Sequence, residues 1–391
     1  MLTAGESHGQ VLVGILEGIP AGLTIEAADI DLQLSRRQRG HGRGGRMRIE
    51  TDRVQILSGV RHGETLGSPI ALLIPNLDWP NWQGRMGVEP PNEPVEPVTR
   101  LRPGHADLPG VLKYGHVDVR NVLERASARE TAMRVALGAV ARCLLARFGV
   151  QVRSETVAIG DVHAELPDWV GTDRNGYRGE RAEAHWEAVE SSPVRCADPE
   201  AERRMVRAID EARAAGDTLG GTFTVVAYGV PPGLGSHIHW DRKLSARLAG
   251  ALMSINSIKG VEIGAGLGGA SLPGSRYHDV IHYSATQGWA RGSNRAGGIE
   301  GGMSNGEPIL VRCAAKPIPT LMKPLPSVDL RTKESAAAGI ERSDVCVVPA
   351  AGVVGEAMVA LVLADAFLEK FGGDSIREID RSYGSYLEGL A

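Results

Sequence analysis

The sequence lacks features that several classes of protein require. It has no excess of basic residues, because 43 Lys and Arg face 47 Asp and Glu, for a formal net charge of −4. Proteins that bind polyanions usually show a basic excess somewhere, so any anion site in this chain must be local. The four cysteines form no C-x-x-C pair, which fits neither a zinc site nor a disulfide framework. We therefore expect a protein of a reducing cytoplasm that binds no metal.

Long apolar runs are also missing. Met1 to Gly5 contain neither a basic region nor an apolar signal core. The most apolar segment, Ala357 to Ala364, is bounded by Glu356 and Asp365, whereas a membrane span requires about 20 apolar residues. We expect a cytoplasmic protein without a membrane span, and we interpret 352–371 as a buried helix. The sequence has no Gly-Lys dipeptide, which excludes a Walker A loop.

The residues that are present can form a large core, since 42% of them are hydrophobic. Helical and strand patterns alternate irregularly, and no linker rich in Pro, Gly and Ser separates two halves, so we predict one α+β domain over 1–391. Apolar residues recur with the period of a helix over 129–148, and Gly149 ends it. The segment 165–217 is polar and is expected to be peripheral. Further helices are predicted at 27–38, 199–216, 243–256 and 352–371, and strands at 11–19, 54–60, 152–159, 222–230, 260–263 and 307–315.

The pentapeptide Gly5–Gly9 matches the G-x-S-x-G pattern of a hydrolase nucleophile elbow. An elbow serine follows a strand of a sheet that is already built, and its oxyanion hole takes an N–H from an earlier loop. Only four residues precede this motif, so its context argues against a serine hydrolase. A glycine turn with an incidental His8 remains the alternative to a functional histidine.

The segment 36–46 packs five arginines among glycines. Guanidinium forks bind phosphate and carboxylate groups in a bidentate manner. Taken alone, such a run is more often a solvated or RNA-binding loop than a small-molecule site. It lacks the interleaved aromatic residues on which single-stranded nucleic acid stacks, and this weakens the nucleic-acid alternative.

Three further motifs could carry chemistry. The turn 102–107 (RPGHAD) would hold His105 beside an arginine, although for this motif alone a capping or loop histidine is the more common case. The extended run 316–320 (KPIPT) and the Arg–Asp pair of 342–344 (RSD) could face a ligand or be structural. The G-x-G-x-x-G match at 264–269 does not indicate a dinucleotide site, because Pro273 prevents the helix that this fingerprint must open.

Read together and in this order, these segments resemble the chorismate synthase family across nearly the whole chain. The resemblance implies an α+β fold, a β-α-β sandwich with helices packed between two antiparallel sheets, assembled as a homotetramer. The segments that carry it are 3–9, 37–38 with 42–47, 102–107, 124–138, 240–243, 294–305, 316–320 and 342–344.

The resemblance also implies a reaction. Members of the family are lyases that catalyse the 1,4-anti elimination of phosphate from 5-enolpyruvylshikimate 3-phosphate to give chorismate, the last common step of the shikimate pathway. The implied cofactor is reduced FMN, with NADPH as an indirect reductant and an external flavin reductase as a partner. A flavin oxidoreductase and a nucleic-acid binder are the alternatives, although we expect no nucleic-acid partner.

By resemblance, His8 is the general acid that protonates the leaving phosphate, which suits a side chain whose ordinary pKa is about 6.5. His105 would protonate the flavin or stabilise its reduced anion, and Asp344 would assist flavin N5 in removing the ring proton. The anionic groups of the substrate or of NADP would be held by Arg37, Arg43, Arg46, Arg102, Arg129 and Arg342. FMN would contact Arg125, Ala126, Ser127, Asn256, Ser257, Gly301, Lys316, Pro317, Ile318, Pro319, Thr320 and Arg342.

The sequence departs from the family pattern at a few positions. Ala126 stands where members often have a second serine, and Ser257 stands where alanine is common. The loss of a hydroxyl at Ala126 removes a hydrogen bond of about 1 kcal/mol. The N-terminus is a few residues shorter than usual, and this puts the first strand in doubt.

Overall fold

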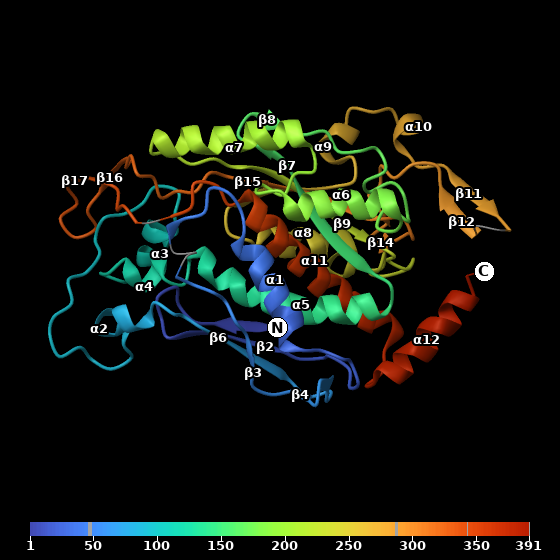
Figure 1. Ribbon diagram of the computed structural model, residues 1–391, viewed down its shortest axis with the longest axis horizontal. Helices are drawn as coiled ribbons and strands as arrows, with labels where there is room; N and C mark the ends of the chain where they lie inside the picture. Colours follow the sequence, from blue (N-terminus) through green and yellow to red (C-terminus); the bar gives the residue numbers. More distant parts are fainter. Residues whose placement is uncertain (46–48, 286–287, 342, 391) are drawn as a thin grey trace.

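The computed structural model describes residues 1–45, 49–285, 288–341 and 343–390. Two antiparallel sheets enclose a layer of helices (Figure 1). This confirms the α+β sandwich expected from the sequence.

The first sheet lies against one side of the helical layer. In β2 (Val11–Leu16) and β6 (Ile70–Pro75), alternate residues are buried. They include Leu12 and Leu16 of β2 and Ile70, Leu72 and Ile74 of β6. Successive side chains of a strand point to opposite faces, so this alternation gives the sheet one apolar face, which packs on the helices. Its strands, in spatial order, are β1 (Leu2–Ala4), β2 (Val11–Leu16), β6 (Ile70–Pro75) and β3 (Gln55–Ile56).

The second sheet covers the opposite side of the helices and is buried on both faces. Phe223 and Val225 of β9 (Gly221–Tyr228) belong to the main core, whereas Val226 and Tyr228 on the other face of that strand pack in a separate cluster with Trp186. Because both faces are covered, its central strands are more apolar than those of a half-exposed sheet. In spatial order the strands are β10 (Ile258–Ile263), β15 (Ile309–Ala315), β9 (Gly221–Tyr228), β7 (Gln151–Ile159) and β8 (Val162–His163).

The helical layer is built around two helices that pack closely, α5 (Thr131–Arg147) and α11 (Val348–Phe371). Gly138 lies where a Cβ atom would be only 2.4 Å from the Cβ of Ala357, so only glycine allows this approach. Figure 1 shows the second of these helices, α11, running between the two sheets. It is long and apolar enough to cross a membrane by composition, but most of it is buried inside the molecule, which accounts for its apolar sequence. The layer contains α1 (Ala27–Gln38), α5 (Thr131–Arg147), α8 (Leu244–Met253) and α11 (Val348–Phe371).

The remaining elements lie around this sandwich. The helix α6 (Glu180–Ser191) packs Ala182, Trp186 and Val189 on the outer face of the second sheet. Part of the segment 165–217, which was expected to be peripheral, therefore covers a sheet. The helices are α2 (Gln83–Met86), α3 (Asp107–Tyr114), α4 (Arg120–Leu123), α6 (Glu180–Ser191), α7 (Pro199–Ala214), α9 (Gly266–Gly269), α10 (Gly274–Tyr277) and α12 (Ile376–Glu388), with short 3-10 turns η2 (Trp79–Asn81), η3 (Ala128–Glu130) and η4 (Trp240–Arg242). The hairpins are β4–β5 (Val60–Arg61, Glu64–Thr65), β11–β12 (Ile281–Ser284, Gly288–Arg291), β13–β14 (Ile299–Glu300, Met303–Ser304) and β16–β17 (Pro326–Val328, Ser335–Ala337).

Candidate active site

The loop between β1 and β2 carries His8 and is fixed to two distant segments. The Ser7 backbone N–H donates to the Glu124 carbonyl at 3.0 Å. The Asn76 side chain, which follows β6, donates from Nδ2 to the carbonyls of Glu6 at 3.1 Å and Gly9 at 2.7 Å. Both ends of the pentapeptide are therefore held, and His8 projects from a backbone with little freedom.

The imidazole of His8 is bound by a buried carboxylate. Its backbone N–H donates to Glu124 Oε2 at 2.8 Å, and its Nδ1 lies 3.0 Å from both oxygens of Glu124. Arg120 donates from Nη1 to Glu124 Oε1, also at 3.0 Å. The side chain of Glu124 is 1% exposed and that of His8 is 16% exposed. A carboxylate on Nδ1 selects the tautomer with the proton on that nitrogen.

One face of the His8 ring is covered by Trp82. The two rings stack with centroids 3.9 Å apart and an interplanar angle of 25°. Trp82 is anchored by its indole N–H, which donates to Asp78 Oδ2 at 2.9 Å. The guanidinium carbons of Arg120 and Arg85 lie 5.1 Å and 5.7 Å from the Trp82 ring. The His8 ring is thus held at its edge and on its face.

His105 has a support of the same kind. Its Nδ1 lies 2.5 Å from Asp107 Oδ1 and 3.1 Å from Arg102 Nη2. Arg102 donates to both oxygens of Asp107, from Nε at 2.9 Å and from Nη2 at 3.0 Å. Asp107, at the start of α3, is fully buried. Each predicted histidine therefore contacts a buried carboxylate that is also paired with an arginine.

These contacts keep both carboxylates ionised. Burial alone would raise the pKa of Asp107, but the hydrogen bonds from His105 and Arg102 lower it to about 2. Burial opposes ionisation of Glu124 in the same way, but the hydrogen bond and charge of His8 hold its pKa below the usual range. Hydrogen bonds to a charged carboxylate favour that form, so each histidine faces a negative charge.

Two of the predicted substrate arginines, Arg37 and Arg129, are buried side by side. Arg129 donates from Nη1 to Asp52 Oδ1 at 2.6 Å and from Nε to Asn76 Oδ1 at 2.9 Å. Arg37 donates from Nε to Thr131 Oγ1 at 3.0 Å. Arg37 Nη1 and Arg129 Nη2 make no hydrogen bond with a described residue, but each faces a buried carboxylate, Asp52 Oδ2 at 3.7 Å and Glu50 Oε2 at 3.6 Å. Buried donors without a hydrogen bond are rare and costly, and a bound anion would supply one.

Arg43 and Asp344 form an ion pair next to this cluster. Arg43 Nη1 lies 2.9 Å from Asp344 Oδ2, and the Gly44 N–H donates to Asp344 Oδ1 at 2.6 Å. Burial lowers the pKa of Arg37 to about 10 despite the opposing charge of Asp52, and the charges of Arg43 and Arg129 add to that decrease. The structure therefore brings Arg37, Arg43, Arg129 and Asp344 together. Arg46 and Arg342 lie outside the described residues.

The arginine run 36–46 does not behave as a solvated loop throughout. Arg36 and Arg37 are 6% and 4% exposed, and both lie in the last turn of α1. Arg36 points into the core, where it forms hydrogen bonds with Glu356 at 2.6 and 2.9 Å. Burial of these two arginines is the opposite of what an RNA-binding loop would require.

The first group of predicted flavin residues comes from two segments, 125–127 after α4 and Asn256 with Ser257 after α8, and its first segment lies against the β1 end of the His8 loop. Arg125 donates to the carbonyls of Thr3 and Gly5, both at 2.9 Å. Asn256 Nδ2 donates to the Ala126 carbonyl at 3.0 Å. The remaining members of the group are Ser127, whose hydroxyl accepts from Ser7 Oγ at 3.0 Å, and Ser257, which has a φ of 72°.

The second group, 316–320, follows β15 and contacts the His105 turn. Lys316 Nζ donates to the Gly104 carbonyl at 2.8 Å, and Arg102 Nη1 donates to Thr320 Oγ1 at 3.4 Å. The Lys316 N–H also donates to the Ser257 carbonyl at 2.9 Å, which joins the two groups. Pro317, Ile318 and Pro319 lie between these contacts.

Gly301 is placed differently from the other predicted flavin residues. It lies in the β13–β14 turn, and the carbonyl of the next residue, Gly302, accepts from the Leu244 N–H at the start of α8. Asn256 and Ser257 follow the other end of that helix, which has 10 residues. A helix of that length spans about 15 Å, so Gly301 is separated from them by roughly the length of α8.

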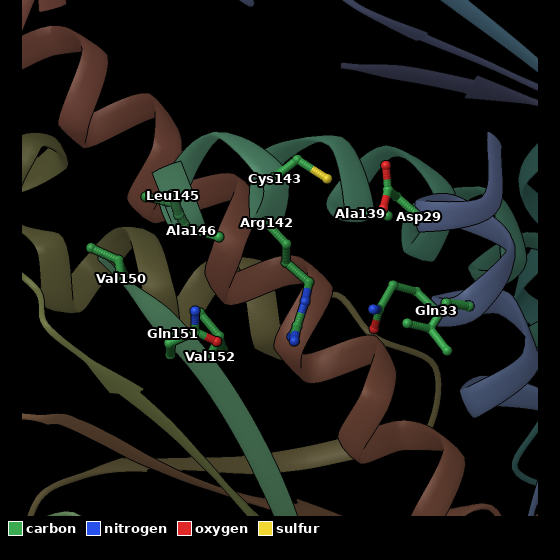
Figure 2. A pocket seen from close by; sticks show the side chains of 11 residues that line it. Asp29, Gln33, Ala139, Arg142, Cys143, Leu145, Ala146, Val150, Gln151 and Val152 are labelled. Carbon is green, nitrogen blue, oxygen red and sulfur yellow. The ribbon is translucent and has the colours of Figure 1, made fainter. Parts of the chain in front are cut away.

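Two cavities of the described chain lie elsewhere. One of about 180 Å³ opens between α1, α5 and the start of β7, and Figure 2 shows Arg142 and Cys143 on its wall opposite Asp29 and Gln33. Burial raises the pKa of Cys143 to about 11, which makes the thiol a poor nucleophile at neutral pH. A second cavity, of about 360 Å³, lies beside Arg36. Neither is lined by His8 or His105, so neither defines the candidate active site.

Reasoning from the sequence missed the residues that orient the histidines. Glu124 and Trp82 lie far from His8 in the chain, and no local motif connects them with it. Asp107 belongs to the quoted 102–107 motif, and its position two residues after His105 was the one available signal for its role. No cluster of three or more His, Cys, Asp or Glu side chains suited to a metal ion occurs in the described part of the chain.

Comparisons with known proteins find relatives that match nearly the whole chain. A family model described as "Chorismate synthase" matches residues 1–368. The chain is 59% identical to "Chorismate synthase" of Moorella thermoacetica over 390 residues, which cover 100% of this chain and 98% of that protein. It is 57% identical to the protein of the same name from Symbiobacterium thermophilum, with coverage of 100% and 99%. A solved structure, "Crystal Structure of Chorismate Synthase", has a TM-score of 0.78 at 44% identity and covers 100% of this chain and 97% of its own.

The matched family and the shared sandwich fold define this chain as an enzyme that acts on a phosphorylated substrate. The chain belongs to the chorismate synthase family, whose members are carbon–oxygen lyases acting on a phosphorylated substrate. The family reaction eliminates phosphate from 5-enolpyruvylshikimate 3-phosphate and gives chorismate, the last common step of the shikimate pathway.

Proposed function

We propose that this chain carries out the family elimination with reduced FMN as its cofactor. In the reaction the C–O bond to phosphate breaks with its electron pair on the leaving oxygen, the ring loses a proton, and a second ring double bond forms. The observation that carries the proposal is the position of Asn76, which accepts from Arg129 and donates to the carbonyl of Gly9. One side chain thereby joins the buried Arg129 to the His8 loop.

The residues around Asn256 fit a flavin. Its Oδ1 is buried and has no hydrogen-bond partner among the described residues, so an acceptor is available for the N–H of a bound ring. Burial lowers the pKa of Lys316, and the charge of Lys259 lowers it further, which suits a site that receives an anion. When bound, reduced FMN lends electron density to the departure of phosphate and recovers it.

The chain's own residues then divide the work. Arg37, Arg43 and Arg129 bind the anionic groups of the substrate, where their attraction is little screened. His8 gives a proton to the leaving phosphate, and protonation makes phosphate a better leaving group. His105 holds a proton at the flavin, and Asp344 assists removal of the ring proton. Arg46, Arg102 and Arg342 complete the anion-binding set.

Four further properties belong to the same proposal. FMN arrives already reduced by an external flavin reductase, with NADPH as the indirect reductant. The chain forms one domain and assembles as a homotetramer. It works in the cytoplasm. Light scattering of the purified protein checks the tetramer directly.

The proposal is tested by anaerobic turnover. Enzyme with dithionite-reduced FMN and 5-enolpyruvylshikimate 3-phosphate is expected to release phosphate and chorismate in equal amounts, whereas oxidised FMN or no FMN gives neither. A sample with oxidised FMN and NADPH shows whether the chain reduces flavin itself, and we expect no turnover there. Absence of phosphate release with reduced FMN would contradict the proposal, and retention of RNA instead would favour the nucleic-acid alternative.

A further inference from the structure

The side chains that hold His8 have a consequence for proton transfer. Glu124 contacts Nδ1 and the backbone N–H of His8, and Trp82 covers one face of the ring. Glu124 itself is fixed by burial and by Arg120. Nε2 is therefore the ring nitrogen that does not contact Glu124, and a proton that His8 transfers must leave from there.

We propose that Glu124 is a positioning residue for His8: with Trp82 it fixes the ring and keeps a proton on Nδ1, so that the imidazolium delivers its Nε2 proton to the leaving phosphate and becomes the neutral Nδ1–H tautomer. This inference rests on the proposed function of His8 as the general acid. Glu124 acts through the histidine and does not itself contact the substrate. A fixed donor loses little freedom on reaching the transition state, and this is how positioned groups accelerate a reaction.

The charges around the ring predict how activity depends on pH. Glu124 and Arg120 face His8 from the α4 segment, and Arg85 of α2 lies behind Trp82. A nearby carboxylate favours the protonated imidazole and a nearby guanidinium disfavours it. Removal of the Glu124 charge leaves Arg120 without this carboxylate, so the imidazolium form would be lost at lower pH.

The central variant is Glu124→Gln, which keeps the shape and removes the charge. We expect kcat to fall by about tenfold or more, but by no more than the 10²- to 10⁴-fold that general acid catalysis contributes, while substrate affinity stays nearly constant. The basic limb of the pH–rate profile is expected to move to lower pH by about one unit. Glu124→Asp restores the charge on a shorter side chain, and it should return that limb toward its original position. Trp82→Phe should have a smaller effect because it keeps an aromatic face.

Glu307 provides a matched control. It is a buried carboxylate that accepts from Arg174 at 2.8 and 2.6 Å and from the Arg291 backbone N–H at 2.9 Å. It is thus bonded like Glu124 but contacts no residue of the proposed catalytic set. Glu307→Gln should leave the pH limb where it is. An unchanged kcat and limb in Glu124→Gln, or the same limb shift in Glu307→Gln, would overturn the proposal.

A measurement on the unmodified enzyme covers the case in which the variants fail to fold. In protein carrying ¹⁵N-labelled histidine, the His8 signal is identified by its loss in a His8→Ala sample. At a pH where the ring is neutral, it should report a proton on Nδ1. A proton on Nε2 would overturn the inference. Because this readout needs no turnover, it separates failure of the inference from failure of the proposed function, which the turnover of the wild-type enzyme decides.

Discussion

His8 and His105 have the same kind of support but different neighbours. Each has a buried carboxylate at Nδ1. His8 stacks on Trp82, whereas the turn of His105 contacts Lys316 of the proposed flavin segment. The contact between the His105 turn and Lys316 supports the proposal that His105 acts at the flavin.

Replacement of His8 tests the first assignment. His8→Ala is expected to slow turnover by about 10²- to 10⁴-fold, the usual contribution of a general acid, and to leave FMN binding largely intact. The loss should be equal whether phosphate or chorismate is measured, because one elimination forms both products.

His105→Ala should behave differently. Its defect is expected in the reduced-flavin complex, as a changed flavin absorbance when substrate binds, because its proposed partner is the flavin ring. Full turnover in the His8 variant, or the same flavin perturbation in both variants, would show that this division of roles is wrong.

The arginine run offers a paired test of anion binding. Arg43→Ala removes a guanidinium next to Arg37 and is expected to weaken substrate binding by about 1.5–3 kcal/mol, the contribution of a charged hydrogen bond. Arg39→Ala is the control, since Arg39 belongs to the same run but is exposed. Calorimetric titration measures both. Equal and small effects would place the run outside the substrate site, and loss of RNA retention in Arg43→Ala would favour the nucleic-acid alternative.

Single residues show where reasoning from the sequence reaches its limit. Histidines and arginines in short motifs are recognisable by their chemistry, and Asp107 lies within reach of His105 along the chain. Glu124 is 116 residues from His8, and only the docking of the β1–β2 loop on the α4 segment brings them together. No local pattern encodes such a contact, because it is a product of tertiary packing.

Among the elements, the helix α11 places a buried carboxylate, that of Glu356, in the core. Glu356 accepts from Arg36 and Arg142, each at 2.6 Å, and from Ser154 Oγ at 2.7 Å. Burial alone would raise its pKa, but the charges of Arg36 and Arg142 hold it well below the usual range. This cluster joins α11 to α1, α5 and β7.

Loss of that charge should destabilise the fold. Glu356→Gln is expected to lower the free energy of unfolding by about 3–5 kcal/mol, because it leaves buried Arg142 without its paired carboxylate and leaves Arg36 with Glu190 alone. Glu369→Gln on the same helix removes an exposed pair with Arg247 and should change it by about 0–1 kcal/mol. Urea unfolding followed by circular dichroism measures both, and similar values for the two variants would refute a stabilising role for the cluster.

The same group predicts an acid dependence. A carboxyl whose pKa is lowered by folding stabilises the protein above its ordinary pKa, and that contribution is lost as pH falls toward the lower value of the folded state. The stability difference between the wild type and Glu356→Gln should therefore shrink as pH falls below about 4.5. A difference that stays constant down to pH 3 would contradict this account.

Prediction of elements succeeded where one periodicity dominates. The helix expected at 27–38 coincides with α1, and the apolar period of 129–148 marks α5 within two residues at its start. The strand expected at 54–60 shrinks to β3 (Gln55–Ile56). The sequence analysis missed α6, because its buried Ala182, Trp186 and Val189 are spaced among charged residues in a segment that is polar as a whole.

At the scale of the molecule, the order of the layers could not be derived from periodicity. The second sheet pairs β15 with β9 and β10, and β9 with β7, so strands far apart in sequence are neighbours. Local patterns indicate where strands occur but not which of them pair. The β-α-β sandwich was predicted through the family resemblance, which already contains that information.

The assembled site predicts that FMN and the substrate bind cooperatively. The substrate's charge complements the arginine cluster, and the flavin residues adjoin the same loops, so we expect FMN to bind tightly only when the phosphorylated substrate is present. Fluorescence titration of FMN with and without 5-enolpyruvylshikimate 3-phosphate measures the difference. Equal affinity in the two titrations would mean that the substrate does not help to form the flavin site.

The central claim is that this chain uses reduced FMN for an elimination without net redox change. The most direct measurement is anaerobic turnover with a large excess of substrate over reduced FMN, with phosphate release and flavin absorbance followed in the same cuvette. We predict many phosphates released per flavin and a flavin that is still reduced when substrate is exhausted. Oxidation of one flavin for each phosphate released would contradict the account and identify the chain as an oxidoreductase.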